Sequence, residues 1–134
     1  MRCFVDSNIP MYVAGRDHRL RDPSRRVLER IRAGDLDACT STEVLQEILY
    51  RYSALARLDL AREVYDLFVR ICPVVLPVTL ADTDRARDLL VGGTGISARD
   101  AVHAGVMLNN DVTTIVTFDA GFDRIPGVKR LQLT

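Results

Sequence analysis

The chain has 134 residues, enough for a domain with a buried core, and we expect residues 1–134 to form a single domain. The 48% share of hydrophobic residues argues against a disordered chain, and 18 acidic against 18 basic residues do not indicate a generally basic surface. The three cysteines are too far apart in the sequence for a disulfide framework or a zinc site: Cys3, Cys39 and Cys72. We therefore expect them to be free buried thiols in the cytoplasm. We expect no signal peptide and no membrane-spanning run.

The first apolar run of the chain ends in an acid. Residues 3–5 predict a buried strand, Asp6 follows it, and residues 9–14 predict a short helix with Pro10 in its first turn. Sites in open α/β sheets form beyond the carboxyl ends of the strands, which makes Asp6 a candidate site residue. Taken alone, Asp6 also fits the simpler role of a helix cap.

An arginine-rich segment follows. Residues 16–32 contain seven arginines, and Asp22 with Pro23 predicts the start of a helix that stops near Gly34. These arginines fit an exposed helix face, and they also fit a rim that contacts phosphates or a partner. Residues 36–40 then predict a second strand.

A capping box over residues 40–43 predicts a helix that runs to about Leu55. Its apolar positions follow helical spacing and form one buried stripe. On a helical wheel Glu43 points away from the middle of that stripe, whereas Glu47 lies on its flank. We therefore expect Glu43 to be solvated and Glu47 to face a cleft beside the core.

The middle of the chain predicts two more helices and a strand. Residues 59–71 have amphipathic spacing, and residues 74–78 predict a strand in which Pro77 indicates the edge of the sheet. A capping box over residues 79–82 opens a helix to about Val91. The glycines of residues 92–95 predict a linker and not a dinucleotide site, because a helix precedes them instead of a strand.

Another capping box, over residues 97–100, opens a helix to about Asn109 that is apolar on nearly all sides. We expect this helix to pack on the sheet, with Gly105 allowing a close approach. Asp100 and His103 lie on the same side of it. Asp100 fits the role of a cap partner, and His103 fits a satisfied, partly buried side chain better than a metal ligand, since no second His or Cys lies nearby.

The last part of the chain repeats the pattern of the first. Residues 112–118 are the most strand-like run, and they end at Asp119 as the first strand ends at Asp6. Residues 128–133 predict a last short strand. Helices between strands predict an α/β fold with a mainly parallel sheet of four to five strands, covered by helices on both faces.

Four acids can meet in such a fold: Asp6 and Asp119 at strand ends, Asp100 at a helix start, and Glu47 on the helix after the second strand. Four carboxylates in one cleft repel each other unless a cation lies among them, and a set of oxygen ligands suits Mg²⁺ or Mn²⁺. Such metals activate water and stabilise the oxygens of a phosphoryl displacement. The pattern therefore favours metal-assisted hydrolysis of a phosphodiester.

The motifs around these acids have a known counterpart. They are Phe4-Val5-Asp6-Ser7-Asn8-Ile9, residues 41–48 ending on Glu47-Ile48, residues 96–104, Thr117-Phe118-Asp119, and residues 122–128. In this order they resemble the PIN-domain ribonucleases, in particular the VapC-type toxins of toxin–antitoxin pairs. The resemblance covers the whole chain.

The resemblance implies a three-layer α/β/α domain that cleaves single-stranded RNA as an endoribonuclease with Mg²⁺ or Mn²⁺. It also implies a homodimer and a cognate antitoxin that blocks the site. The metal-site and catalytic acids carried over by position are Asp6, Glu47, Asp100 and Asp119, with Asn8, Thr117 and Asp123 as supporting residues. His103 occupies a position that varies in the family and is given no catalytic role.

Two other hypotheses remain beside the nuclease. The first is a PIN-like module that binds RNA or a partner without strong catalysis, which the four intact acids disfavour. The second is a receiver-type signalling domain, another small parallel α/β fold with an acidic pocket. That fold requires paired acids after the first strand and a lysine after a late one, whereas Asp6 stands alone and Lys129 lies too near the end of the chain.

Overall fold

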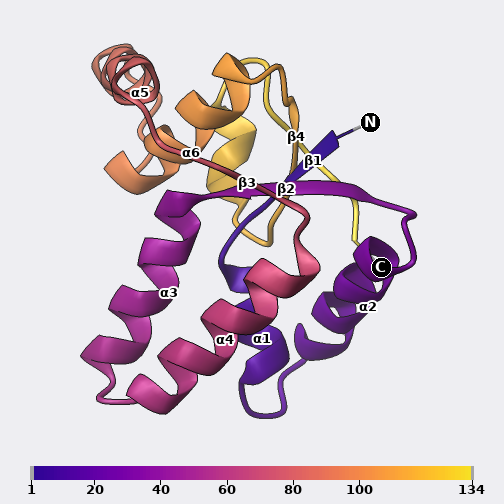
Figure 1. The fold of residues 1–134 in the computed structure, drawn as a ribbon. Coiled ribbons are helices and arrows are strands. Elements are labelled where there is room, and N and C mark those ends of the chain that lie inside the picture. The colour runs from indigo at the N-terminus through magenta and orange to yellow at the C-terminus, as the bar shows by residue number, and fades with distance from the viewer. Residues whose placement is uncertain (1, 134) are drawn as a thin grey trace.

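The computed structural model of the chain describes residues 2–133. Five parallel strands form one sheet in the order β3-β2-β1-β4-β5 (Figure 1). The strands are β1 (Arg2–Val5), β2 (Asp37–Ser41), β3 (Val74–Leu76), β4 (Thr114–Val116) and β5 (Lys129–Arg130). In the centre of the sheet Phe4 pairs with Cys39 on one side and with Ile115 on the other. The parallel sheet predicted from the alternation of strands and helices is confirmed.

Helices cover both faces of this sheet. In Figure 1, α1 (Asn8–Ala14), α2 (Arg21–Arg32), α3 (Thr42–Ala54) and α4 (Leu58–Ile71) lie below the strands, whereas α5 (Leu80–Val91) and α6 (Ala98–Asn109) lie above them. A 3₁₀ helix, η1 (Ala120–Arg124), connects β4 to β5. The three-layer α/β/α architecture is therefore confirmed. Among residues 2–133, no helix has both the length and the apolar character that a membrane span requires.

The central strands are short apolar runs because both of their faces are covered. Cys3, Phe4 and Val5 of β1 are buried, as are Ile115 and Val116 of β4. The three cysteines are free and buried, as expected from their spacing. The first strand is thus held in the middle of the core, and its carboxyl end places Asp6 at a fixed point.

The strand predicted over residues 112–118 is shorter in the structure. Only Thr114–Val116 pair with β1; before them the backbone N–H of Val112 donates to the carbonyl of Met107 in α6, and after them the hydroxyl of Thr117 accepts the N–H of Asp119. Asp119 consequently lies three residues beyond β4, where it begins η1 and accepts the N–H of Gly121 at 2.8 Å. β3 is an edge strand, as Pro77 predicted.

The predicted caps have different outcomes. The box that opens α5 is complete: Thr79 and Asp82 each accept the backbone N–H of the other. At α6 the hydroxyl of Ser97 accepts the N–H of Asp100. The box predicted for α3 is wrong, because the hydroxyl of Thr40 donates instead to the carbonyl of Val5 and so ties β2 to β1.

Two other local predictions are corrected by the structure. α2 begins at Arg21, one residue before Asp22, so Asp22 lies inside the first turn and is not the N-cap. Gly105 does allow a close approach, but to α5 rather than to the sheet. A Cβ atom at Gly105 would lie 2.4 Å from the carbonyl oxygen of Asp82. The absence of a side chain there lets α6 pack directly on the backbone of α5.

Candidate active site

Asp6 is the fixed centre of a cluster of acids at the carboxyl edge of the sheet. Its backbone N–H continues the ladder to β4 by donating to the carbonyl of Val116 at 3.1 Å. Asp6 as a residue is 5% exposed, and its carboxylate accepts the backbone N–H of Ser7 and the hydroxyl of Thr117, each at 2.7 Å. Burial raises the pKa of Asp6, although His103 and the bond from Thr117 oppose that effect. Asp6 is therefore an oriented buried acid and not a helix cap.

Thr117 joins three of the predicted residues. Its hydroxyl donates to Asp6 and accepts the side-chain amide of Asn8 at 3.1 Å. It also accepts the backbone N–H of Asp119 at 3.1 Å. This hydroxyl therefore links the side chains of Asn8 and Asp6 with the backbone of Asp119. The supporting role of Asn8 and Thr117 stays a prediction.

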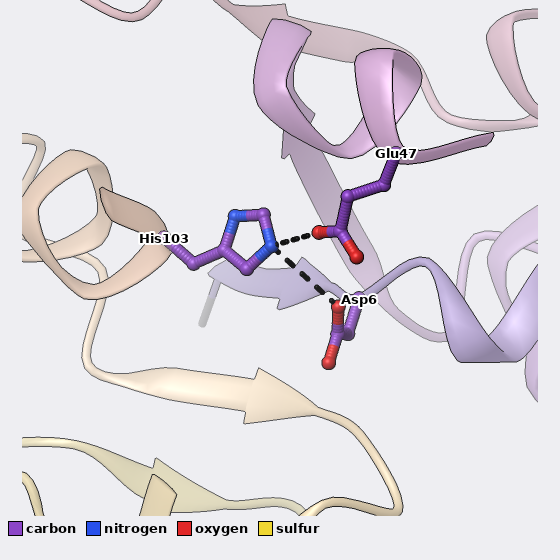
Figure 2. Close-up of side chains that lie close together, drawn as sticks. All are labelled: Asp6, Glu47 and His103. Atoms are coloured by element: carbon purple, nitrogen blue, oxygen red, sulfur yellow. Dashed lines mark hydrogen bonds and ion pairs between the residues drawn. The ribbon is translucent and has the colours of Figure 1, made fainter. Parts of the chain in front are cut away.

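Glu47 reaches the same edge from α3. One of its carboxylate oxygens accepts the hydroxyl of Ser7 at 3.0 Å, and the other accepts Nε2 of His103 (Figure 2). Its side chain is 13% exposed, which agrees with the prediction that it faces a cleft beside the core. Glu47 and Asp6 are thus linked through Ser7, whose backbone N–H binds Asp6 while its hydroxyl binds Glu47.

His103 lies deeper in the site than the sequence predicted. Its side chain is fully buried beneath the two acids, with Nε2 3.8 Å from Oδ1 of Asp6 and the ring beside Phe4. A carboxylate has no proton to donate, so the bond between Nε2 and Glu47 requires the proton on the imidazole. Burial disfavours the charged ring, but the bond to Glu47 and the nearby carboxylates outweigh burial and raise the pKa of His103. While this bond persists, Nε2 holds Glu47 in place and is not free to bind a metal.

Asp100 and Asp119 complete the cluster. Burial, together with the negative charges of Asp119 and Asp6, raises the pKa of Asp100 to about 6. Asp119 is exposed and lies at the outer side of the group. The repulsion that the sequence predicted among clustered acids therefore acts on Asp100, the acid that also lies in the first turn of α6.

Arg99 provides a cation on the rim of this cluster. Its guanidinium lies 3.7 Å from Glu47 and 3.8 Å from Glu43, and its carbon CZ lies 5.5 Å from the centre of the Tyr50 ring. The expectation that Glu43 would be solvated on the outer side is wrong, because its side chain is only 27% exposed and faces Arg99. Residues four apart on a helix differ by only about 40° in direction, so Glu43 and Glu47 share a side.

Asp123 makes its contacts elsewhere. Its carboxylate forms two hydrogen bonds of 2.9 Å with the guanidinium of Arg130 on β5, and this bond lowers its pKa. The structure brings Asp6, Glu47, Asp100 and Asp119 together with Asn8 and Thr117. It does not bring Asp123 into contact with them among the residues described.

The cluster has the chemistry of a divalent-metal site. Asp6 and Glu47 offer carboxylate oxygens within 4.8 Å of each other and of a ring nitrogen of His103, and the bond from His103 to Glu47 keeps Nε2 out of the ligand set. Each oxygen of Asp6 accepts one strong hydrogen bond, which leaves a lone pair on each for a metal. Carboxylate oxygens are the ligands that Mg²⁺ and Mn²⁺ prefer, and a cation would relieve the repulsion around Asp100. The donor set therefore fits a divalent cation bound mainly by oxygen.

Three neighbours of the acids were not predicted as part of the site: Ser7, His103 and Arg99. Ser7 had a local signal, since it directly follows Asp6 and is one of two small polar residues at a strand end. His103 had a weaker one, because it is one helical turn from Asp100 on the same side of α6. Arg99 next to Asp100 had no signal that distinguished it from the other arginines.

Known proteins similar in sequence fall in one group. The family model described as "PIN domain" matches residues 3–128. Ribonuclease VapC13 of Mycobacterium tuberculosis is 42% identical over 127 residues, which cover 95% of this chain and 97% of that protein. Ribonuclease VapC23 of the same organism is 39% identical over 116 residues, which cover 87% and 91% respectively.

Solved structures share the fold at lower identity. VapBC2 from Rickettsia felis, solved bound to a DNA fragment from its promoter, matches with a TM-score of 0.77 at 21% identity and covers all of both chains. VapC20 of Mycobacterium tuberculosis, described as a Sarcin-Ricin loop cleaving toxin, matches with a TM-score of 0.73 at 20% identity. That match covers 88% of this chain and 90% of the other.

Proposed function

This chain belongs to the PIN-domain family, among the VapC ribonucleases, and on that basis we propose that it is an endoribonuclease. It hydrolyses phosphodiester bonds of single-stranded RNA with Mg²⁺ or Mn²⁺. The observation that carries the proposal is the meeting of Asp6, Glu47, Asp100 and Asp119 at one edge of the sheet. They come from four separate segments of the chain, and their charges act on one another.

A divalent cation at this edge supplies a Lewis acid and an activated water for attack on phosphorus. The chain supplies the rest. Asp6 holds its carboxylate still through Ser7 and Thr117, and Glu47 is held through Ser7 and His103. These two acids would hold the cation with lone pairs left free by their hydrogen bonds. Asp100 in the first turn of α6 and Asp119 at the N-cap of η1 would complete the set, and one of the site carboxylates would serve as the general base.

The test is cleavage of a panel of defined RNAs with added Mn²⁺ and with excess chelator. We expect cleavage only with metal, and we expect Asp6→Asn to abolish it. Asp37→Asn is the matched control, because Asp37 is an exposed acid at the start of β2 that pairs with Arg2 far from the carboxyl edge. Equal cleavage in chelator would contradict the metal mechanism. Metal-loaded protein that binds RNA or a protein partner but cleaves no RNA would instead identify a binding module.

We further propose that the protein acts in the cytoplasm as the toxin of a toxin–antitoxin pair and forms a homodimer. The acidic site supports an inhibitory partner, because an inserted Arg or Lys would meet Asp6 and Glu47 as a cation does. The candidate antitoxin is the product of a neighbouring small reading frame. We expect co-expression to restore growth and the two proteins to purify together. If growth is not restored and the two proteins do not purify together, the toxin–antitoxin proposal is refuted, whereas the nuclease proposal is unaffected. Molar mass in solution tests the dimer.

A further inference from the structure

A pocket of about 540 Å³ opens beside the acid cluster. Ser7, Glu47 and Arg99 belong to both, so the pocket continues directly from the site. One wall comes from α1 and the loop that follows it, and includes Tyr12 and His18. The other wall comes from α3 and includes Tyr50. An extended ligand that lies along the acid cluster can therefore also reach this pocket on the α3 side.

Aromatic rings line both walls. Tyr50 is 58% exposed although it is a large aromatic residue on a helix, and the guanidinium of Arg99 covers part of its ring. On the opposite wall the rings of Tyr12 and His18 are 4.9 Å apart at 30°. Exposed aromatic faces beside a planar guanidinium favour a flat ligand, because each offers a surface for stacking. The pocket therefore offers surfaces on which a planar ring can stack.

The pocket also carries positive charge in a protein of zero net charge. Arg16 and Arg51 line it, and neither makes an ion pair with an acid among residues 2–133. Arg99 lies 3.7 and 3.8 Å from its two glutamates, too far for short hydrogen bonds, so it can turn to another anion. Planar stacking surfaces with unpaired arginines are the chemistry of single-stranded nucleic-acid binding.

We propose that this pocket binds a nucleobase of single-stranded RNA next to the phosphodiester that is cleaved. The base stacks between the Tyr50 and Tyr12 walls, and Arg16 and Arg51 contact the adjacent phosphates. The pocket thus sets which base stands beside the cleaved bond. This inference rests on the proposed ribonuclease activity and adds the place where the substrate is read. An apolar segment of a protein partner is the competing occupant.

The first test measures RNA binding in excess chelator, where cleavage does not interfere, with labelled single-stranded oligonucleotides. We expect Tyr50→Ala to raise Kd by roughly tenfold or more, the usual effect of removing one stacking ring. Tyr50→Phe keeps the ring and should bind within about twofold of wild type. The matched control is Leu49→Ala, since Leu49 is the preceding exposed residue of α3 and does not line the pocket. Equal melting temperatures verify that the variants are folded.

A second test locates the base. The affinity of oligonucleotides that each lack one base is measured for wild type and for Tyr50→Ala. At one position, we expect the missing base to weaken binding to wild type but not to the variant. Replacing Arg16 and Arg51 together by Gln should reduce the salt dependence of binding by about 1.4 in the log–log slope, the value for two phosphate contacts to a single strand. In the presence of metal, Tyr50→Ala should raise KM more than it lowers kcat.

The outcomes separate this inference from the ribonuclease proposal. If wild type cleaves RNA and Tyr50→Ala binds and cleaves it equally well, the proposal that the pocket binds a base is refuted. The ribonuclease proposal is then unaffected. Loss of partner-protein binding in Tyr50→Ala with RNA binding unchanged would assign the pocket to the protein and also overturn it. If wild type neither binds nor cleaves RNA, both proposals fail.

Discussion

Replacing Asp100 by Asn distinguishes a capping role from a place in a crowded anionic site. Asp100 lies in the first turn of α6, where a negative charge favours the helix by about 0.3–1 kcal/mol. In the cluster the same charge is unfavourable, because burial and the charges of Asp119 and Asp6 raise the pKa of Asp100 from its ordinary 3.8 to about 6. The two roles therefore predict opposite changes in stability.

The size of the effect follows from the pKa. A folded-state pKa above the unfolded one means that the unfolded chain loses its proton first, so stability falls as pH rises from about 4 to about 6 and is constant above that. At about 1.4 kcal/mol per pKa unit, the full shift would correspond to roughly 3 kcal/mol near pH 7.5, and solvent screening of the half-buried side chain reduces this cost to roughly 1.5 kcal/mol. Subtracting the lost helix contribution leaves Asp100→Asn more stable by roughly 1 kcal/mol near pH 7.5.

Thermal unfolding without metal measures this difference. For a chain of this length, about 1 kcal/mol corresponds to a Tm higher by roughly 3–5 °C near pH 7.5, with a smaller gain near pH 4.5. We also expect Asp100→Asn to lose most of the stabilisation that Mn²⁺ gives wild type, and to be inactive. A lower Tm near pH 7.5, or a variant that is active and stabilised by metal, would refute the place of Asp100 in the site.

Ser97→Ala is the control for the cap. The hydroxyl of Ser97 accepts the N–H of Asp100, so its loss should cost about 1 kcal/mol. This cost should be the same near pH 4.5 and near pH 7.5, because Ser97 does not titrate. Cleavage should remain measurable, since the four acids are kept.

Three further predictions follow. Glu47→Gln should abolish RNA cleavage, whereas Glu43→Gln should leave it nearly intact, because Glu43 pairs with the rim cation Arg99 and not with the site acids; the reverse rates would contradict this. His103→Leu should lower kcat by at least about tenfold and His103→Gln should recover part of the loss, since Gln can still donate to Glu47. Gly105→Ala should lower the free energy of unfolding by about 1–3 kcal/mol, and with it Tm, although Ala has the better helix propensity. The reason is that its Cβ would meet the backbone of α5. A raised Tm would show that the two helices can separate freely.

The sequence determined the elements and the acids that lie at their ends. Apolar runs such as residues 3–5 specify buried strands wherever they occur, and an acid that follows such a run must leave the sheet at its carboxyl edge. Helical spacing likewise predicted that Glu47 borders the core. Asp6, Glu47, Asp100 and Asp119 could therefore be chosen together, since the order of a parallel α/β chain brings such ends to one side.

Local patterns were less reliable where one side chain had two possible partners. The hydroxyl of Thr40 could cap α3 or bind the neighbouring strand, and only the packed sheet offers the carbonyl of Val5. Asp123 could join the acids or pair with Arg130, and the return of the chain into β5 brings Arg130 within reach. Each choice depended on a partner that local sequence does not specify.

Tertiary structure alone decided which polar groups surround the acids. His103 and Glu47 are 56 positions apart, and Ser7 and Glu47 are 40 apart. These pairs form only because α3 and α6 pack around the end of β1, which fixes the distance between side chains on different helices. The pocket between α1 and α3 has the same origin, since its walls are adjacent only in the folded chain. Sequence periodicity fixes the direction of a side chain on its own element, and packing fixes what that side chain meets.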